Sequence, residues 1–188
     1  MDSKDPLAPL LAATSYGDQV AARTLMVSLE PKVRSLCAHL GSGDNVDDLV
    51  QETLMRVIAG ASRFHGHSTV LTWALRIARN VCVDDVRARQ RSRRLTDRLI
   101  ALRTDDVTGS MDVSHHLLNV LERSQREAFV LTQLAGLTYD EAAEIAGCPV
   151  GTIRSRVARA REALRDASER ADAESFGPTG RPAKRRSA

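Results

Sequence analysis

The stretch "YDEAAEIAGCPVGTIRSRV", residues 139–157, has the composition of two short helices that meet at a tight turn. Thr138 and Glu141 have the spacing of a capping box at the start of the first helix. Gly147 supplies the left-handed backbone of the turn, and Pro149 suits the first turn of the second helix, where no N–H partner is lost. The apolar positions around the turn are small or branched, which lets two helices approach closely: Ala142, Ala143, Ile145, Ile153 and Val157. This combination predicts a helix-turn-helix.

The second helix of this motif carries a face of arginines without nearby acids. At about 100° per residue, one side of residues 148–164 is apolar: Ile153, Val157, Ala160 and Leu164. The opposite side and its flank are polar or small: Thr152, Arg154, Ser155, Arg156, Ala158, Arg159 and Arg161. No acid occurs before Glu162, whereas a solvated helix usually mixes charges to form i,i+4 pairs. The pattern favours contact with nucleic acid over the alternative of a plain solvated face.

Composition indicates a helical protein with charge segregated along the chain. The 188 residues are 43% hydrophobic but only 3% aromatic, so aliphatic side chains supply the core. Net charge is +3, yet positions 76–94 hold seven arginines against Asp84 and Asp85. Positions 44–52 hold four acids and no base. Such segregation predicts separate surfaces for different partners, one of them a polyanion.

Several function classes find no support in the sequence. Cys37, Cys82 and Cys148 form no metal-binding spacing, which leaves them as small core residues or free thiols. His65 and His67 have no third ligand nearby, so we expect no metal and no cofactor. No signal peptide and no long apolar run are present, and a soluble, cytoplasmic protein without a membrane segment is expected.

Hydrophobic periodicity predicts an all-α fold of two small helical domains joined by a flexible linker, with the helix-turn-helix in the second. The expected parts are a flexible N-terminus over 1–12, a first domain over 13–97, a linker over 98–112, a second domain over 113–172 and a disordered basic tail over 173–188. Within the first domain, Ser68 is expected to cap a long helix that begins at Thr69. An earlier helix follows Asn45 and turns Leu49 and Val57 inward.

Three segments, in this order, resemble extracytoplasmic-function (ECF) sigma factors of the sigma-70 family. They are "DDLVQETLMRV" (47–57), "FHGHSTVLTWALRIARNVCVDDVR" (64–87) and "GLTYDEAAEIAGCPVGTIRSRVARARE" (136–162). The resemblance covers roughly residues 10–170 and identifies the two domains with sigma-70 regions 2 and 4. It implies a subunit that joins core RNA polymerase, through the β′ clamp helices and the β flap, and directs it to promoter DNA. A small-molecule substrate is not implied.

The resemblance also assigns roles to residues of the first domain. Docking on the polymerase is implied for an exposed polar face that could otherwise be merely solvated: Asp47, Asp48, Gln51, Glu52 and Arg56. Capture of an unstacked base at the minus-ten element is implied for a loop pocket and a residue beneath it: His65, Gly66, His67, Ser68, Val70, Leu71 and Asn80. Phosphate contacts there are implied for Arg76, Arg79, Arg87 and Arg91. Because Val70 and Leu71 replace aromatics common in relatives, capture of one base is expected rather than stacking on several. For Trp73, core packing is favoured.

In the second domain the resemblance places part of the arginine face in the major groove of the minus-thirty-five element: Arg154, Ser155, Ala158 and Arg159. The residues expected nearer the phosphates are Gly151, Thr152, Arg156 and Arg161. An arginine on a guanine edge is the expected specific contact.

Two other classes of protein remain as alternatives. An autonomous regulator with a LuxR-like helix-turn-helix would leave the acidic helix and the loop before the arginine-rich helix unexplained. An enzyme would need a nucleotide-binding glycine loop, a metal cluster or a nucleophile–base pair, and none is evident. With no regulatory extension expected on the chain, control is expected from another protein, such as an anti-sigma factor, or from expression level.

Overall fold

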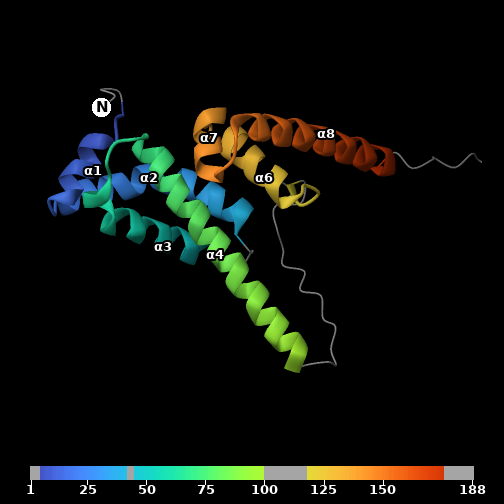
Figure 1. Cartoon of the computed structure of the whole chain (residues 1–188), viewed down its shortest axis with the longest axis horizontal. Helices are drawn as coiled ribbons and strands as arrows, with labels where there is room; N and C mark the ends of the chain where they lie inside the picture. Colours follow the sequence, from blue (N-terminus) through green and yellow to red (C-terminus); the bar gives the residue numbers. More distant parts are fainter. Residues whose placement is uncertain (1–4, 42–44, 100–117, 176–188) are drawn as a thin grey trace, which may run out of the picture.

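The computed structural model describes residues 5–41, 45–99 and 118–175 of the chain. Within these ranges every regular element is helical, which confirms the all-α class. None of the helices in these ranges is both long enough and apolar enough to cross a membrane. The helices form two groups, and the N-terminal group lies beside the C-terminal one (Figure 1).

The N-terminal group contains four α-helices and one 3-10 turn: α1 (Ala8–Ser15), α2 (Gln19–Leu40), α3 (Val46–Ala59), η1 (Ala61–Arg63) and α4 (Val70–Leu99). Asp18 caps α2 by accepting hydrogen bonds from the backbone N–H groups of Val20 and Ala21, at 2.8 and 3.0 Å. The core of this group is aliphatic and fully buried, and it includes Leu25, Leu29, Val33, Leu36, Val57, Leu75 and Ala78. Packing of α2, α3 and α4 around these residues fixes the surface that each helix leaves to solvent.

The start of the chain differs from the sequence prediction. Residues 8–12 were expected to belong to a flexible N-terminus, but they form most of α1, and Leu11 is only 2% exposed. The Asp5 carboxylate accepts a hydrogen bond from the Val70 N–H at 2.7 Å and so helps to cap α4. Ser68 does not cap this helix as predicted, because the helix begins one residue later and Thr69 Oγ1 accepts from the Thr72 N–H at 3.1 Å.

The C-terminal group contains α6 (Arg123–Phe129), the π-helical turn η2 (Val130–Leu134), α7 (Tyr139–Ala146) and α8 (Val150–Ser175). Thr138 and Glu141 form the predicted capping box at the start of α7. Gly147 ends α7 with φ 66°, in the left-handed region that turns the chain into α8. The predicted helix-turn-helix is therefore present, formed by α7 and α8.

The two groups pack against each other, and one continuous apolar cluster runs through both. Helix α4 contacts α7, while α2 contacts α6 and η2. Helix α4 continues two residues past the predicted domain end at 97, and α8 continues to Ser175, beyond the predicted end at 172. The predicted linker from residue 100 on, the start of the second domain at 113–117 and the tail from 176 lie outside the described residues. The division of the chain into domains therefore stays a prediction.

Candidate nucleic-acid interface

Helix α8 separates a buried seam from a polar face as its sequence predicts. Ile153, Val157 and Ala160 are at most 1% exposed and hold the helix against α6 and α7. The residues expected at base edges are all exposed: Arg154, Ser155, Ala158 and Arg159. Of the residues expected near phosphates, Gly151 and Arg161 are exposed, and Thr152 and Arg156 are half-buried. The fold thus presents one continuous face of α8 to solvent.

The arginines of this face differ in their partners. Arg161 donates to the side-chain oxygen of Gln133 at 2.9 Å, and Arg156 donates to the Cys148 sulfur at 3.7 Å. Among the described residues, Arg154 and Arg159 have neither an ion pair nor a side-chain hydrogen bond. Their guanidinium groups keep all their donors for an external acceptor.

Helix α3 presents all five residues that were expected to dock on the polymerase: Asp47, Asp48, Gln51, Glu52 and Arg56 are exposed. The acids are not all unpaired, however. Arg34 of α2 pairs with Asp47 at 2.6 Å, and Arg56 pairs with Glu52 at 2.7 Å. Met55, which was not among the predicted docking residues, is 61% exposed on the same side of α3. Its exposure could have been predicted, because Met55 lies outside the apolar stripe of α3.

The loop before α4 forms part of a cavity of about 570 Å³. His65, Gly66, His67 and Ser68 line it from the loop, residues of α1 line a second side, and Glu141 and Glu144 of α7 line a third. Trp73 supports the loop from below by packing on Phe64, with ring centroids 5.3 Å apart. This partly buried position agrees with the core-packing prediction for Trp73.

The structure corrects the predicted membership of this pocket. Val70 is 0% exposed and belongs to the core, so it cannot contact DNA in this fold. It occupies the first position of α4, whose inward face it begins. Leu71 is half-buried against the core, and Asn80 is exposed on α4, but neither lines the cavity. The loop residues come together as predicted, whereas the helix residues do not.

The four arginines of α4 that were expected to hold phosphates fall into two pairs. Arg87 and Arg91 are exposed and form no ion pair within the described ranges. Arg76 instead forms an ion pair with Glu144 of α7, and Arg79 pairs with Glu127 of α6 at 2.6 Å. The ion pair of Arg79 and Glu127 is well shielded from solvent, because their side chains are only 25% and 12% exposed. Arg76 and Arg79 are therefore engaged by carboxylates of the C-terminal group.

Comparison with known proteins shows the family to which the chain belongs. Residues 25–92 match the family description Sigma-70 region 2, and residues 115–164 match Sigma-70, region 4. The ECF RNA polymerase sigma factor SigC of Mycobacterium tuberculosis is 39% identical over 167 residues, which is 82% of this chain and 87% of that protein. The ECF RNA polymerase sigma-E factor of Escherichia coli K12 is 32% identical over 173 residues, 82% of this chain and 90% of that protein. The chain belongs to the ECF sigma factor family.

A solved structure agrees with this assignment. The sigma factor RpoE of Bartonella quintana, solved in complex with the anti-sigma factor NepR, superposes with a TM-score of 0.68 and 33% identity. The match covers 78% of this chain and 96% of that one. The protein is thus a transcription initiation factor that directs RNA polymerase to promoters, with region 2 in the N-terminal group and region 4 in the C-terminal group.

In this sigma factor the ion pairs of Arg76 and Arg79 are contacts between regions 2 and 4. A third contact joins the Thr72 hydroxyl of α4 to the Glu141 carboxylate of α7 at 2.8 Å. Partial burial of Glu141 opposes its ionisation, but hydrogen bonds from Thr138 and Thr72 outweigh burial and lower the pKa of Glu141. Glu141 is therefore charged at neutral pH, and its contact with Thr72 persists there.

Proposed function

We propose that this sigma factor reads the minus-thirty-five element with the exposed face of α8. The observation that carries the proposal is the pair Arg154 and Arg159, two exposed guanidinium groups that have no partner among the described residues, on a helix fixed by a buried seam. A rigid helix that presents free bidentate donors suits guanine edges in the major groove. Ser155 and Ala158 lie beside them on the same face. Arg161 and Arg156 are proposed to hold the flanking phosphates with Gly151 and Thr152.

For the minus-ten element, we propose the loop cavity as the site that receives one unstacked base. Polar and aromatic groups of His65 and His67 line it from region 2. Glu141 and Glu144 of region 4 close its other side, so the loop becomes open to a base when the two regions separate. Arg87 and Arg91, exposed on α4, are proposed to hold the backbone beside it, with Asn80 facing the strand. Arg76 and Arg79 can join them only after Glu144 and Glu127 leave, because a guanidinium paired with a carboxylate has few donors left for phosphate.

This geometry makes promoter recognition depend on the polymerase. In the described arrangement region 4 covers two of the phosphate-binding arginines proposed in region 2. The free protein should therefore bind promoter duplex weakly. Attachment of both regions to the polymerase would separate them and raise the effective concentration of each at its own element. The chain acts by binding, and the polymerase core supplies the chemistry.

For docking on core RNA polymerase, we propose the exposed face of α3, with Asp48 and Gln51 as the polar contacts and Met55 as an apolar contact among them. Asp47, Glu52 and Arg56 take part after exchange of their own ion pairs. A mixed-sign patch with one apolar side chain suits reversible, electrostatically steered docking on the β′ clamp helices. The β flap is proposed as the partner of region 4, and an anti-sigma factor as a regulator, as in the B. quintana relative.

Charge reversal tests this proposal on the holoenzyme. Asp48→Lys should weaken binding of the full-length protein to core polymerase on the order of tenfold or more, because Asp48 is exposed and forms no ion pair with any described residue. Glu169→Lys makes the same change of charge on an exposed residue of α8 far from α3 and should leave core binding unchanged. The measurement is competition against the labelled wild-type protein for a limiting amount of core polymerase. Equal affinities for both variants would contradict docking through α3.

A further inference from the structure

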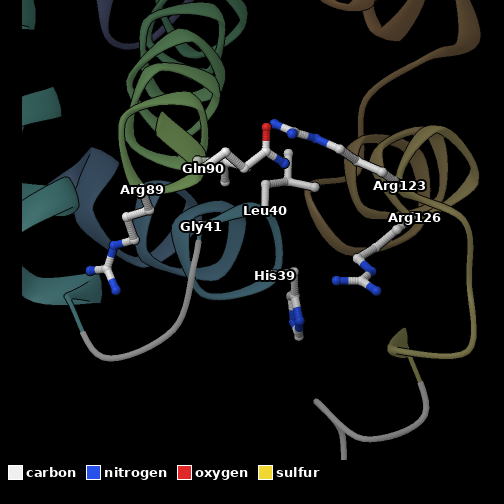
Figure 2. Close-up of a pocket in the computed structure, with 8 residues that line it drawn as sticks. His39, Leu40, Gly41, Arg89, Gln90, Arg123 and Arg126 are labelled. Carbon is white, nitrogen blue, oxygen red and sulfur yellow. The ribbon is translucent and has the colours of Figure 1, made fainter. Parts of the chain in front are cut away.

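A second cavity lies where regions 2 and 4 meet, away from the loop before α4. Its volume is about 350 Å³. The end of α2, the middle of α4 and the start of α6 surround it, and its lining residues are His39, Leu40, Gly41, Val86, Arg89, Gln90, Arg123 and Arg126. Figure 2 shows Gln90 and Arg123 pointing toward one another across the opening, with Arg126 extending from α6 on the same side as Arg123. None of the residues assigned above to DNA or polymerase lines this cavity.

Two of the three arginines that line the cavity, Arg123 and Arg126, have no carboxylate partner among the described residues. The described lining of the cavity includes three arginines and a histidine but no carboxylate. Arg89 points away from Arg123 and Arg126 (Figure 2), and it pairs with Asp85 at 3.3 Å. Arg123 forms no ion pair or side-chain hydrogen bond with any described residue. The charge of the cavity is therefore concentrated on α6.

The guanidinium group of Arg126 has a hydrogen-bond donor that the described residues do not satisfy. One terminal nitrogen of its guanidinium donates to the backbone carbonyls of Asn119 and Leu121, at 3.4 and 3.3 Å. Its Nε is buried and has no acceptor among the described residues. Burial, followed by the nearby charge of Arg123, lowers the pKa of Arg126. Two guanidinium groups that repel each other, one with a buried free donor, form a site that an anion would stabilise.

We propose that this cavity binds a small anion that carries phosphate groups. Guanidinium groups match the geometry of phosphate oxygens and bind them through paired N–H donors. Arg123 and Arg126 supply the charge, and the side-chain amide of Gln90 supplies a neutral donor from region 2. A volume of about 350 Å³ lies in the range of sites for small ligands. A nucleic-acid strand instead follows an extended groove, such as the exposed surface around Arg87 and Arg91.

Because the cavity lies between regions 2 and 4, a ligand bound there would hold the two regions together. Residues of region 2 and region 4 both line it, so the anion binds only when the two regions are together. A ligand that binds one arrangement shifts the population toward it. In this arrangement Arg76 and Arg79 stay paired with Glu144 and Glu127. The bound anion therefore opposes the separation that promoter binding requires.

Isothermal titration calorimetry on the full-length protein tests the proposal with inorganic phosphate, pyrophosphate and ATP as probes. At least one of these should bind, and pyrophosphate or ATP should bind more tightly than phosphate because two phosphate groups can engage both arginines. Arg123→Gln removes an exposed charge that has no partner among the described residues, so the fold should remain. An unchanged thermal unfolding midpoint without ligand would verify this. This variant should bind the preferred probe on the order of tenfold to a hundredfold more weakly, as expected for the loss of charge-assisted hydrogen bonds.

Arg23→Gln provides the matched control, because Arg23 is exposed on α2 and does not line the cavity. It should bind the probe as the wild-type protein does. Absence of binding by all three probes would overturn the proposal. Equal weakening by Arg123→Gln and Arg23→Gln would also overturn it, because it would indicate a general effect of net charge. A single-stranded oligonucleotide that binds more tightly than every small probe, and depends on Arg123, would assign the cavity to nucleic acid instead.

Discussion

The arginines of α8 and the arginines of α4 have the same chemistry but different surroundings. Arg154 and Arg159 on α8 are exposed and have no partner in the part of the chain that the structure describes. Arg76 and Arg79 on α4 are held by carboxylates of α7 and α6. One DNA-binding surface is thus open in the free protein, while part of the other is covered by its own region 4.

This difference shows that a helix face rich in arginine in the sequence is not necessarily free to bind DNA in the folded protein. Both helices have strings of arginines with few acids on the same segment. The acids that cover α4 come from residues about 50 to 70 positions away in the chain, namely Glu127 and Glu144. Availability is therefore a property of how the two regions pack, and it can change when they separate.

Replacement of Glu127 by Gln should give the largest effect, because it leaves Arg79 partly buried without its counter-charge. We expect Glu127→Gln to lower the free energy of unfolding by about 1.5–3 kcal/mol, as for the loss of a hydrogen bond to a charged group. Urea titration measures this change. Glu122→Gln is the matched control on an exposed acid at the start of α6, with an expected change within about 0.5 kcal/mol. Similar values for the two variants would mean that the Arg79–Glu127 pair does not hold α4 and α6 together.

The fold was more predictable than these contacts, because helix periodicity and capping depend on residues close in sequence. The seam of α8, the capping box at Thr138 and the left-handed Gly147 all follow from spacings of three or four residues. The helix over residues 8–12 was not predicted, because α1 is only eight residues long and its one deeply buried leucine, Leu11, leaves little periodic signal. Tertiary packing gives α1 its stability, and packing is not visible in a short segment.

The pairing of side chains from distant helices could not be predicted at all. Cys37 and Cys82 looked unrelated in the sequence, yet both are fully buried between α2 and α4. The hydrogen bond between their thiols lowers the pKa of Cys37 and, with burial, raises that of Cys82. Val70 was misassigned to the DNA pocket for a similar reason, because only the direction of α4 shows that its first residue faces the core.

Replacement of Arg159 by Ala should affect transcription through loss of a base contact on the open surface. Because Arg159 is exposed opposite the buried seam, Arg159→Ala should leave the fold intact. Loss of a bidentate contact should cost about 1–3 kcal/mol and relax preference at one position of the minus-thirty-five element. A promoter library transcribed with the variant holoenzyme measures this preference. A loss that is equal for every promoter sequence would contradict base reading by Arg159.

Replacement of Arg161 by Ala should have a smaller effect of a different kind. Arg161 is already oriented by Gln133 and lies toward the flank of α8, where a phosphate is the expected partner. Arg161→Ala should weaken transcription from all cognate promoters alike. The slope of log affinity against log salt for holoenzyme binding should become shallower by about one ion. A change of preference at one promoter position, with an unchanged salt slope, would assign Arg161 to a base.

Replacement of Glu144 by Gln should give the smallest effect and test the covered surface directly. The side chains of Arg76 and Glu144 are 35% and 46% exposed, so solvent screens the pair and its contribution is at most about 1 kcal/mol. Glu144→Gln should free Arg76 for phosphate and raise the affinity of the free protein for duplex DNA roughly twofold to fivefold, as that energy implies. Fluorescence anisotropy with a labelled duplex at fixed salt measures it. At neutral pH the lowered pKa of Glu141 keeps its contact with Thr72, so the regions should remain together and the gain should stay small.

Asp140→Asn separates release of Arg76 from a general change of charge. Asp140 is an exposed acid on α7 that forms no ion pair with the described side chains of α4, and its replacement alters net charge by the same amount. Asp140→Asn should therefore raise DNA affinity less than Glu144→Gln. In the holoenzyme, where the regions are expected to be apart, Glu144 no longer covers Arg76 and the two variants should have equal affinities for promoter DNA. If Glu144→Gln kept its advantage over Asp140→Asn in the holoenzyme, Glu144 would repel DNA directly, and the contrast between an open α8 and a covered α4 would lose its mechanistic meaning.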